Sequence, residues 1–315
     1  GRASMEENTT GDHNVAVGNK ALQKNTTADD NTAVGNFALN QNTTGTQNVA
    51  VGSTSLDSNT TGANNVSIGH TAMESNTTGQ RNVAIGSHTL DAGNGSFNVA
   101  VGHNSLTAST ASNNTAVGYQ SLLANTTGTD NVAVGPGALD ANTTGSYNIG
   151  IGKDTLGAAT TASFNVGVGN GALKVATTGD SNIGIGAGAL FVNTTGDDNV
   201  AIGRAALSSN TTASNNTAVG RDALLSNITG TANVAVGANS LDANTTGNNN
   251  VGVGNSSLGA NTTGAANTGL GIGTLAATTT GNHNTAIGYN ALNDNTTASN
   301  NTALGHNSLG ANTSG

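Results

Sequence analysis

The segment from Asn131 to Tyr147 reads N-V-A-V-G-P-G-A-L-D-A-N-T-T-G-S-Y, and close copies of it fill nearly the whole chain of 315 residues. The first copy starts at Asn14 and the last at Asn301, which makes eighteen repeats. Complete copies have seventeen residues, except that those starting at Asn82 and Asn98 are one residue short. This regularity predicts a quasi-one-dimensional protein in which each repeat mainly contacts its neighbours. Repeat positions are numbered 1 to 17 from the leading Asn.

The first five positions predict a short strand, because apolar residues alternate over a β-branched segment that ends in Gly. Position 4 is aliphatic in every copy, as at Val17 and Val34, and we predict that it is a core column. Position 2 shares that face and is Val or Ile in twelve copies and Thr in six, which places it nearer an edge. Position 3 is only ever Ala, Ser or Gly, so something is expected to pack closely over the opposite face.

The rest of the repeat predicts turns and a second core column. Leu follows the strand Gly by four residues, as at Leu22 and Leu39, and only Met73 replaces it. The N-T-T-G segment has turn chemistry, because Asn and Thr bond locally to the backbone and Gly admits positive φ. The leading Asn is expected to form a ladder from coil to coil, as at Asn14, Asn31 and Asn48.

These features together predict an all-β fold, a parallel β-solenoid with one seventeen-residue coil per repeat. We expect residues 1–13 to be a lead-in with a partial repeat, and residues 14–315 to be one continuous solenoid of eighteen repeats. Stacked coils about 4.8 Å apart would make a single elongated rod.

Six positions of the repeat vary freely, namely 6, 7, 10, 11, 16 and 17, and we predict that they face solvent. They hold every charged residue except Arg2, Glu6 and Glu7, together with all six His and all seven aromatic residues. Exposed aromatic rings are candidate contacts for a glycan or a protein. The alternative is that these rings are scattered over the surface without a binding role. The candidates are Phe37, Tyr119, Tyr147, Phe164, Phe191 and Tyr289.

Composition argues against several classes of function. Only 8% of residues are charged and the net charge is −9, so we expect no nucleic-acid partner. The chain has no Cys and no apolar run long enough to span a bilayer. The His residues lack the close pairing of a metal site, since His88 and His103 occupy different repeat positions. No nucleophile and base recur at an informative spacing, so we predict no enzyme, no cofactor and no metal.

The N-V-A-I-G segment at Asn82 to Gly86 resembles the head repeats of the YadA-like trimeric autotransporter adhesins. Residues Asn284 to Leu292 also resemble the N-T-A-V-G-x-x-A-L repeats of phage tail fibres. The adhesin resemblance implies a left-handed parallel β-roll assembled as a homotrimer. This repeat is longer than that of the adhesin heads by an N-T-T-G-type turn. A monomeric left-handed β-helix of triangular section is the alternative architecture.

The sequence therefore favours a non-enzymatic, extracellular fibre or adhesin segment on a cell or virion surface, whose partner is a host glycan or surface protein. The alternative is a structural filament that self-associates end to end through uncapped solenoid ends. Ice binding is disfavoured, because the Thr residues of position 2 are irregular and the T-T turn is curved. The N-x-[ST] motifs at Asn25, Asn42, Asn59 and Asn76 are interpreted as a turn ladder in preference to glycan acceptors.

Overall fold

The computed structural model describes residues 1–313, which divide into two compact units. Unit 1 consists of Gly1–Asp154 with Ala159–Thr161, and unit 2 consists of Thr155–Ala158 with the chain from Ala162 onward. Each unit is a stack of similar coils, and each coil contributes one three-residue strand. Among the described residues, no helix has the length and apolar character needed to cross a membrane.

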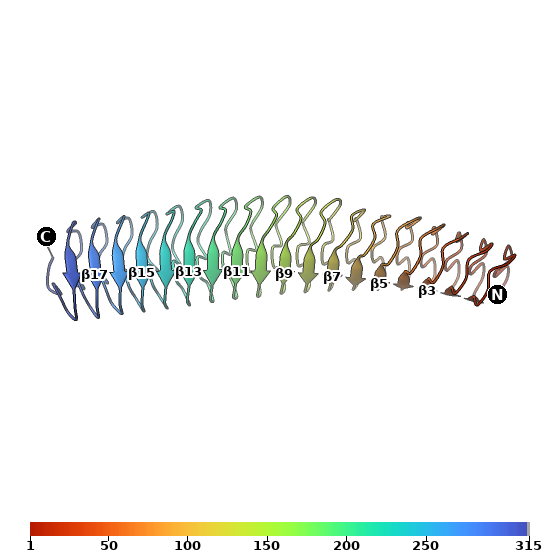
Figure 1. The fold of residues 1–315 in the computed structure, drawn as a ribbon, viewed down its shortest axis with the longest axis horizontal. Coiled ribbons are helices and arrows are strands. Elements are labelled where there is room, and N and C mark those ends of the chain that lie inside the picture. The colour runs from red at the N-terminus through yellow and green to blue at the C-terminus, as the bar shows by residue number, and fades with distance from the viewer. Residues whose placement is uncertain (314–315) are drawn as a thin grey trace. The chain divides into compact units, whose positions relative to one another are not determined.

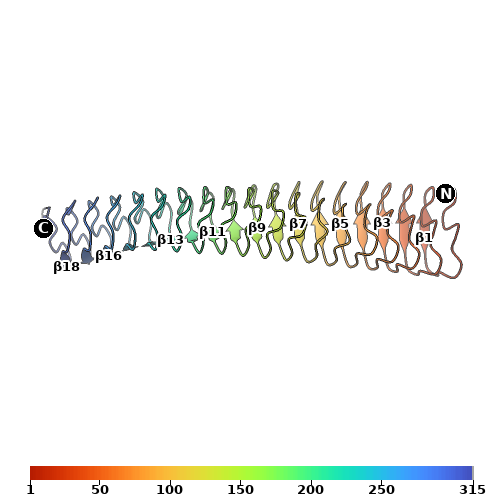
Figure 2. The ribbon, with the colours of Figure 1, turned by 90° about the horizontal axis from the view of Figure 1, so that it is seen from above.

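The strands of unit 1 run side by side in Figure 2. They are β1 (Val15–Val17), β2 (Thr32–Val34), β3 (Val49–Val51), β4 (Val66–Ile68), β5 (Val83–Ile85), β6 (Val99–Val101), β7 (Thr115–Val117), β8 (Val132–Val134) and β9 (Ile149–Ile151).

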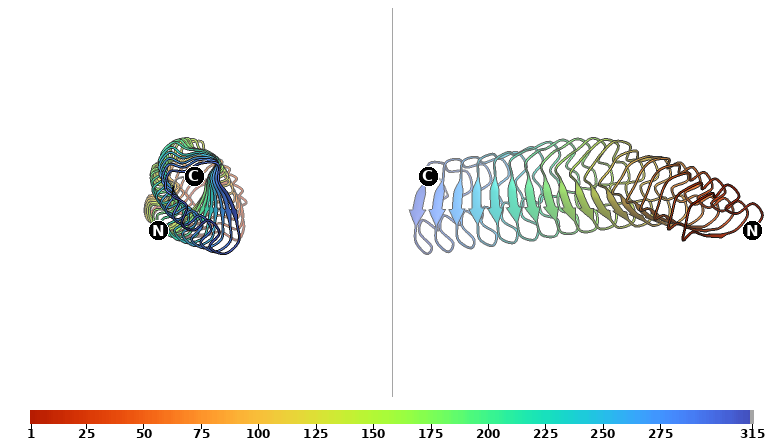
Figure 3. Two further views of the ribbon diagram at one scale, coloured as in Figure 1. Left: turned by 90° about the vertical axis from the view of Figure 1, so that its left-hand side faces the viewer. Right: turned by 45° about the vertical axis from the view of Figure 1, so that its right-hand side comes forward.

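The strands of unit 2 all point the same way in Figure 1, and Figure 3 (right) shows the loops that return each coil to the next strand. They are β10 (Val166–Val168), β11 (Ile183–Ile185), β12 (Val200–Ile202), β13 (Thr217–Val219), β14 (Val234–Val236), β15 (Val251–Val253), β16 (Thr268–Leu270), β17 (Thr285–Ile287) and β18 (Thr302–Leu304).

Pairing within each unit is parallel and in register from one repeat to the next. Val15 pairs with Thr32, and Val17 pairs with Val34. Equivalent positions of β10 and β11 pair in the same way in unit 2. One repeat is therefore one coil, and the predicted parallel β-solenoid with seventeen-residue coils is confirmed.

The strands turn the opposite face inward from the one predicted. Position 3 is buried, as at Ala33 and Ala201, whereas Val17 at position 4 is 57% exposed and Val34 is only half-buried. The prediction that position 4 is a core column is therefore wrong. Alternation fixes which residues share a face, but not which face points inward.

The width of the coil explains why position 3 is small. A Cβ added to Gly184 would lie 3.2 Å from Cγ of Leu173, in the preceding coil. Close packing over position 3 is thus confirmed, but the packing group is the Leu ladder inside the coil. Leu22 and Leu39 are fully buried, as predicted for the second core column.

The buried Leu residues also have a left-handed backbone, which their side chains disfavour. The φ angles of Leu22 and Leu39 are 54° and 52°. The N–H of Leu22 donates to the carbonyl oxygen of Ala38 in the next coil at 3.0 Å. Hydrogen bonds between coils and burial of the side chain together hold a conformation that sequence propensity does not suggest.

The Asn residues of position 1 form the predicted ladder, through bonds to backbone groups. The backbone N–H of Asn31 donates to Oδ1 of Asn14 at 2.9 Å, and that of Asn48 donates to Oδ1 of Asn31 at 2.9 Å. Nδ2 of Asn31 donates to the carbonyl oxygen of Gly45, fourteen residues later in the same repeat, at 2.9 Å. Each Asn therefore closes its own coil and binds the next one.

A second Asn ladder runs through position 12, in the N-T-T-G segment. Nδ2 of Asn42 donates to Oδ1 of Asn25 at 3.0 Å and to the carbonyl oxygen of Gly45 at 2.8 Å. These Asn residues are buried, as are Asn59 and Asn76, so they are inaccessible to glycan attachment in the folded chain. The interpretation of the N-x-[ST] motifs as a turn ladder is the one that the geometry supports.

The position-12 ladder is interrupted where the repeat has another residue. Five repeats lack Asn at position 12: two of them have Ser109 and Ala176, and the other three, with Gly93, Ala159 and Thr278, directly follow a coil that has Asn. In the preceding coils, the buried Oδ1 atoms of Asn76, Asn142 and Asn261 have no hydrogen-bond partner. Each of these three runs of Asn residues thus ends in one unsatisfied acceptor.

The strand Gly at position 5 is required by the backbone and by the next coil. Gly220 has a φ of +138°, which other residues avoid. A Cβ there would lie 2.5 Å from the carbonyl oxygen of Gly237. The Gly of the N-T-T-G segment, by contrast, does not have a positive φ, so the reason proposed for it from sequence is wrong.

We predict that Gly220→Ala destabilises unit 2 by at least about 2–3 kcal/mol, because it combines a disfavoured φ with a clash against backbone. Gly188→Ala is the matched control, since Gly188 has a φ of +66° and a Cβ added there would have nothing within 4 Å. That change should cost only about 1 kcal/mol, because the left-handed penalty of about 1–2 kcal/mol is partly offset by the lower entropy of the unfolded chain. Urea unfolding followed by circular dichroism measures both variants, and equal effects would contradict the proposed role of position 5.

We predict that Asn244→Ala costs more stability than Asn261→Ala. Asn244 takes part in two ladder bonds, to Asn227 at 2.8 Å and from Asn261 at 2.9 Å, and Asn261 takes part in only the second. Each lost buried hydrogen bond should cost about 1–3 kcal/mol. Chemical denaturation of the two variants gives the difference, and a larger loss for Asn261→Ala would show that the ladder is not what stabilises these coils.

Candidate functional site

The outer face of each sheet is an apolar surface made by positions 2 and 4. In unit 1 its exposed side chains include Ile68, Ile85 and Ile151, and in unit 2 they include Ile202 and Leu270. Ile202 is 39% exposed and Leu270 is 47% exposed. Every residue at these two positions is Val, Ile, Leu or Thr, so no charge interrupts the surface.

Contiguous exposed apolar surface is unusual on a soluble protein and marks sites of interaction. The short strands repeat the same two outward side chains from coil to coil, so each unit has a regular, uncharged face. Exposed apolar residues of position 6, among them Tyr119, Ile272 and Tyr289, lie just beyond the strand Gly. This face was missed from sequence because its residues were assigned to the core.

The six aromatic candidates occupy four different positions of the repeat, namely 6, 7, 10 and 17. Phe37 has the ammonium group of Lys20 5.1 Å from its ring centroid. Tyr147 in unit 1 and Phe164 in unit 2 are both exposed at position 17. Phe191, at position 10, is half-buried. Tyr289 stacks on His306 with ring centroids 5.3 Å apart.

Tyr119 belongs to a row of four rings in consecutive coils of unit 1, which we call the ring row. The centroid of His103 lies 5.9 Å from that of Tyr119, and His88 lies 5.9 Å from His103. His70 continues the row at 5.6 Å from His88. The expectation that different repeat positions keep His88 and His103 apart is therefore wrong.

Position 16, assigned from sequence to a freely varying surface, also has a structural role. The backbone N–H of Asp180 donates to Oδ1 of Asp197 at 2.8 Å, and that of Asp197 donates to Oγ of Ser214 at 2.9 Å. Side-chain acceptors here complete hydrogen bonding between coils. The frequent Asp, Asn and Ser residues at this position were the available sequence signal.

Three acidic residues occupy position 10 in consecutive coils beside the ring row, namely Asp57, Glu74 and Asp91. Burial raises the pKa of the Asp57 carboxyl above its ordinary value, and the negative charge of Glu74 raises it further. Burial also raises the pKa of Asp91, against a lowering influence of His88 and of backbone hydrogen bonds. Both Asp57 and Asp91 have a buried Oδ1 without a hydrogen-bond partner.

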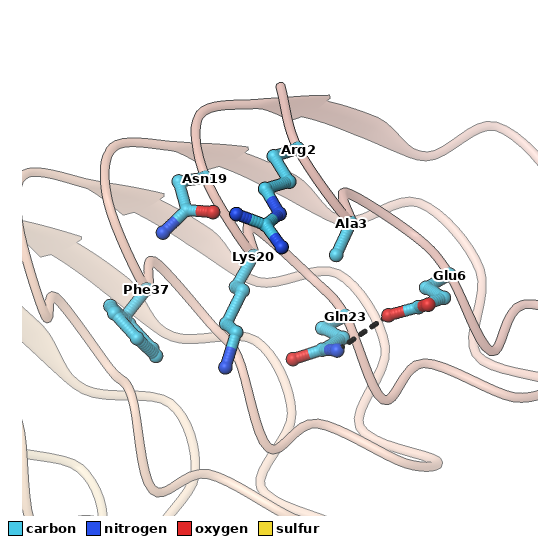
Figure 4. Close-up of a pocket in the computed structure, with 7 residues that line it drawn as sticks. All are labelled: Arg2, Ala3, Glu6, Asn19, Lys20, Gln23 and Phe37. Atoms are coloured by element: carbon cyan, nitrogen blue, oxygen red, sulfur yellow. Dashed lines mark hydrogen bonds between the residues drawn. The ribbon is translucent and has the colours of Figure 1, made fainter.

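A shallow pocket of about 490 Å³ lies in unit 1 between the lead-in segment and the first coils. Figure 4 shows its lining, which includes Arg2 and Lys20 and the hydrogen bond from Gln23 to Glu6, 2.6 Å long. The remaining lining residues are Ala3, Asn19 and Phe37. This lining combines the cationic side chains of Arg2 and Lys20 with the carboxylate of Glu6.

The comparisons with known proteins do not assign a family. No protein-family model matches the chain, and no curated protein matches it. Within residues 1–313, no three His, Cys, Asp or Glu side chains converge on a point where a metal ion would be held. The apolar outer face and the ring row are the two candidate sites that the described residues offer.

We predict that Asp57→Asn raises the stability of unit 1 at neutral pH, by less than about 1 kcal/mol as is typical of partly exposed charges. The raised pKa means that ionisation of Asp57 disfavours the folded state, so the gain appears as pH rises through that pKa. In acid, where the wild-type carboxyl is protonated, the gain should vanish. Thermal unfolding from pH 3 to pH 8 tests this, with Asp198→Asn on an exposed position as the control. A gain that is independent of pH would contradict the electrostatic explanation.

Proposed function

We propose that this protein is a non-enzymatic fibre segment that associates laterally with copies of itself through the apolar outer face. The observation that carries the proposal is the uncharged row of aliphatic side chains at positions 2 and 4, which one isolated chain leaves partly in water. Removing apolar surface from water favours association in proportion to the area that is covered. A repeating face also fits a second copy, because equivalent residues recur at the same spacing on both chains.

A homotrimer is the assembly that we propose, in keeping with the resemblance to trimeric adhesin heads. Three sheets facing a common axis would cover the outer faces and leave no apolar face in water. The variable positions away from the sheet would then carry the contacts with other molecules. We propose that those contacts are made at an extracellular surface, where the fibre spaces or presents a binding region for a glycan or protein.

The bonding between coils is mostly uncharged, which supports a mechanical role for the segment. Bonds between coils come from backbone groups and from Asn and Thr side chains, as between the Asn31 and Asn48 repeats. The Thr residues of position 13 contribute as well, since Oγ1 of Thr245 donates to the carbonyl oxygen of Thr262 at 3.0 Å. Few of these interactions involve charge, so salt should weaken the coil little.

We predict that the purified chain is a trimer and that Val219→Lys with Val236→Lys makes it a monomer, because these neighbouring outward residues would place buried, unpaired charges in the interface. Self-association should weaken at least tenfold. Light scattering coupled to size-exclusion chromatography measures the mass. The matched control is Thr229→Lys with Thr246→Lys, which adds the same charges in neighbouring repeats at an exposed position away from the sheet.

A monomeric wild-type chain would overturn the lateral association. Electron microscopy of the same sample separates lateral from end-to-end assembly. Filaments that lengthen with concentration in both double variants would favour the alternative of a filament stacked through its ends.

A further inference from the structure

Three of the six His residues of the chain lie in three consecutive coils of unit 1. His70 and His88 have ring centroids 5.6 Å apart, with ring planes inclined at 56°. His88 and His103 have centroids 5.9 Å apart, with planes inclined at 61°. All three side chains are exposed, so an ion from solution can reach them. His88 is the shared member of both pairs.

These separations are short enough for two imidazoles to share one metal ion. A metal–nitrogen bond is about 2.0–2.1 Å and the ring centre lies about 1.1 Å beyond its nitrogen, so the centroids of two such ligands are at most about 6.4 Å apart. Both observed distances fall within this limit. Inclined planes also leave the edges of neighbouring rings, where the nitrogens lie, able to converge.

Groups around His88 favour its use as a ligand. Oγ of Ser87 is 2.8 Å from Nδ1 of His88, and when Nδ1–H donates to it, Nε2 has a free lone pair. The carboxyl group of Asp91 interacts electrostatically with His88, and its buried Oδ1 has no hydrogen-bond partner. A cation at His88 would therefore interact favourably with the carboxyl group of Asp91.

We propose that His70, His88 and His103 form two overlapping two-imidazole sites that bind one divalent first-row transition ion per chain. Because His88 belongs to both pairs, only one pair is occupied at a time. No third His, Cys, Asp or Glu side chain of the described region converges with either pair, and we expect water to complete the coordination. Cu²⁺ should bind more tightly than Ni²⁺ or Zn²⁺, following the usual order of affinities.

The ion would link coils in which the position-12 Asn ladder is interrupted. The repeats starting at Asn82 and Asn98 are the two short ones, and position 12 holds Gly93 and Ser109 there in place of Asn. An ion held by His88 with either neighbour connects two adjacent coils in this region. Binding to the folded state alone stabilises it, so the ion should protect these coils from unfolding.

Calorimetric titration of the full chain with Cu²⁺ tests the proposal. We expect one ion per chain, and at least tenfold weaker binding for His88→Ala and for the double variant His70→Ala with His103→Ala. Either single variant, His70→Ala or His103→Ala, should change the affinity by no more than about threefold, because one pair remains. His306→Ala is the matched control, since its ring stacks on Tyr289 in a two-ring pair that has only one imidazole.

Circular dichroism of each variant checks that folding is intact, and His88→Gln repeats the test with a polar side chain of similar size. Equal Cu²⁺ affinity of the His88→Ala and His306→Ala proteins would overturn the proposal, as would loss of binding in His70→Ala alone. Oligomeric state does not enter this test, so its result is independent of the proposed fibre function.

Discussion

The solenoid depends on the leading Asn of each repeat, whose side chain bonds two places at once. Oδ1 of Asn31 accepts the backbone N–H of Asn48 in the next coil, and Nδ2 of the same residue donates to Gly45 at the end of its own coil. Each such buried bond contributes about 1 kcal/mol, and its absence would leave a backbone group unsatisfied. Hydrogen bonds from a short polar side chain thus help to hold the coils together, a role that a large hydrophobic core has in a globular domain.

The narrow interior that this arrangement creates decides where the apolar residues go. Position 3 admits only small side chains because the Leu of the preceding coil occupies the space beside it, as Leu173 does at Gly184. The aliphatic residues of positions 2 and 4 are then turned outward, where Val17 and Ile202 remain partly in water. The molecule buries most Asn residues of positions 1 and 12 and exposes most of its Ile residues, and this inversion is the basis for the proposed lateral association.

The stacking of coils also brings together residues that the repeat positions separate. His88 is at position 7 and His103 at position 6, but the left-handed backbone at position 7 and the one-coil step place their rings next to each other. Similarly, Asp57 and Glu74 become electrostatic neighbours because position 10 stacks on itself. Chemistry on this scaffold arises between coils, so it depends on which residues occupy successive repeats.

The sequence by itself determined the repeat, the strand at its start, the parallel solenoid, the Asn ladder from Asn14 onward and the Leu column from Leu22. These follow from local periodicity and from side chains that suit one conformation. Only the tertiary structure decided which strand face points inward, because alternation is symmetric between the two faces and the aliphatic residues suit either side. It alone showed the left-handed Leu residues and the ring row, since these rest on contacts with the next coil.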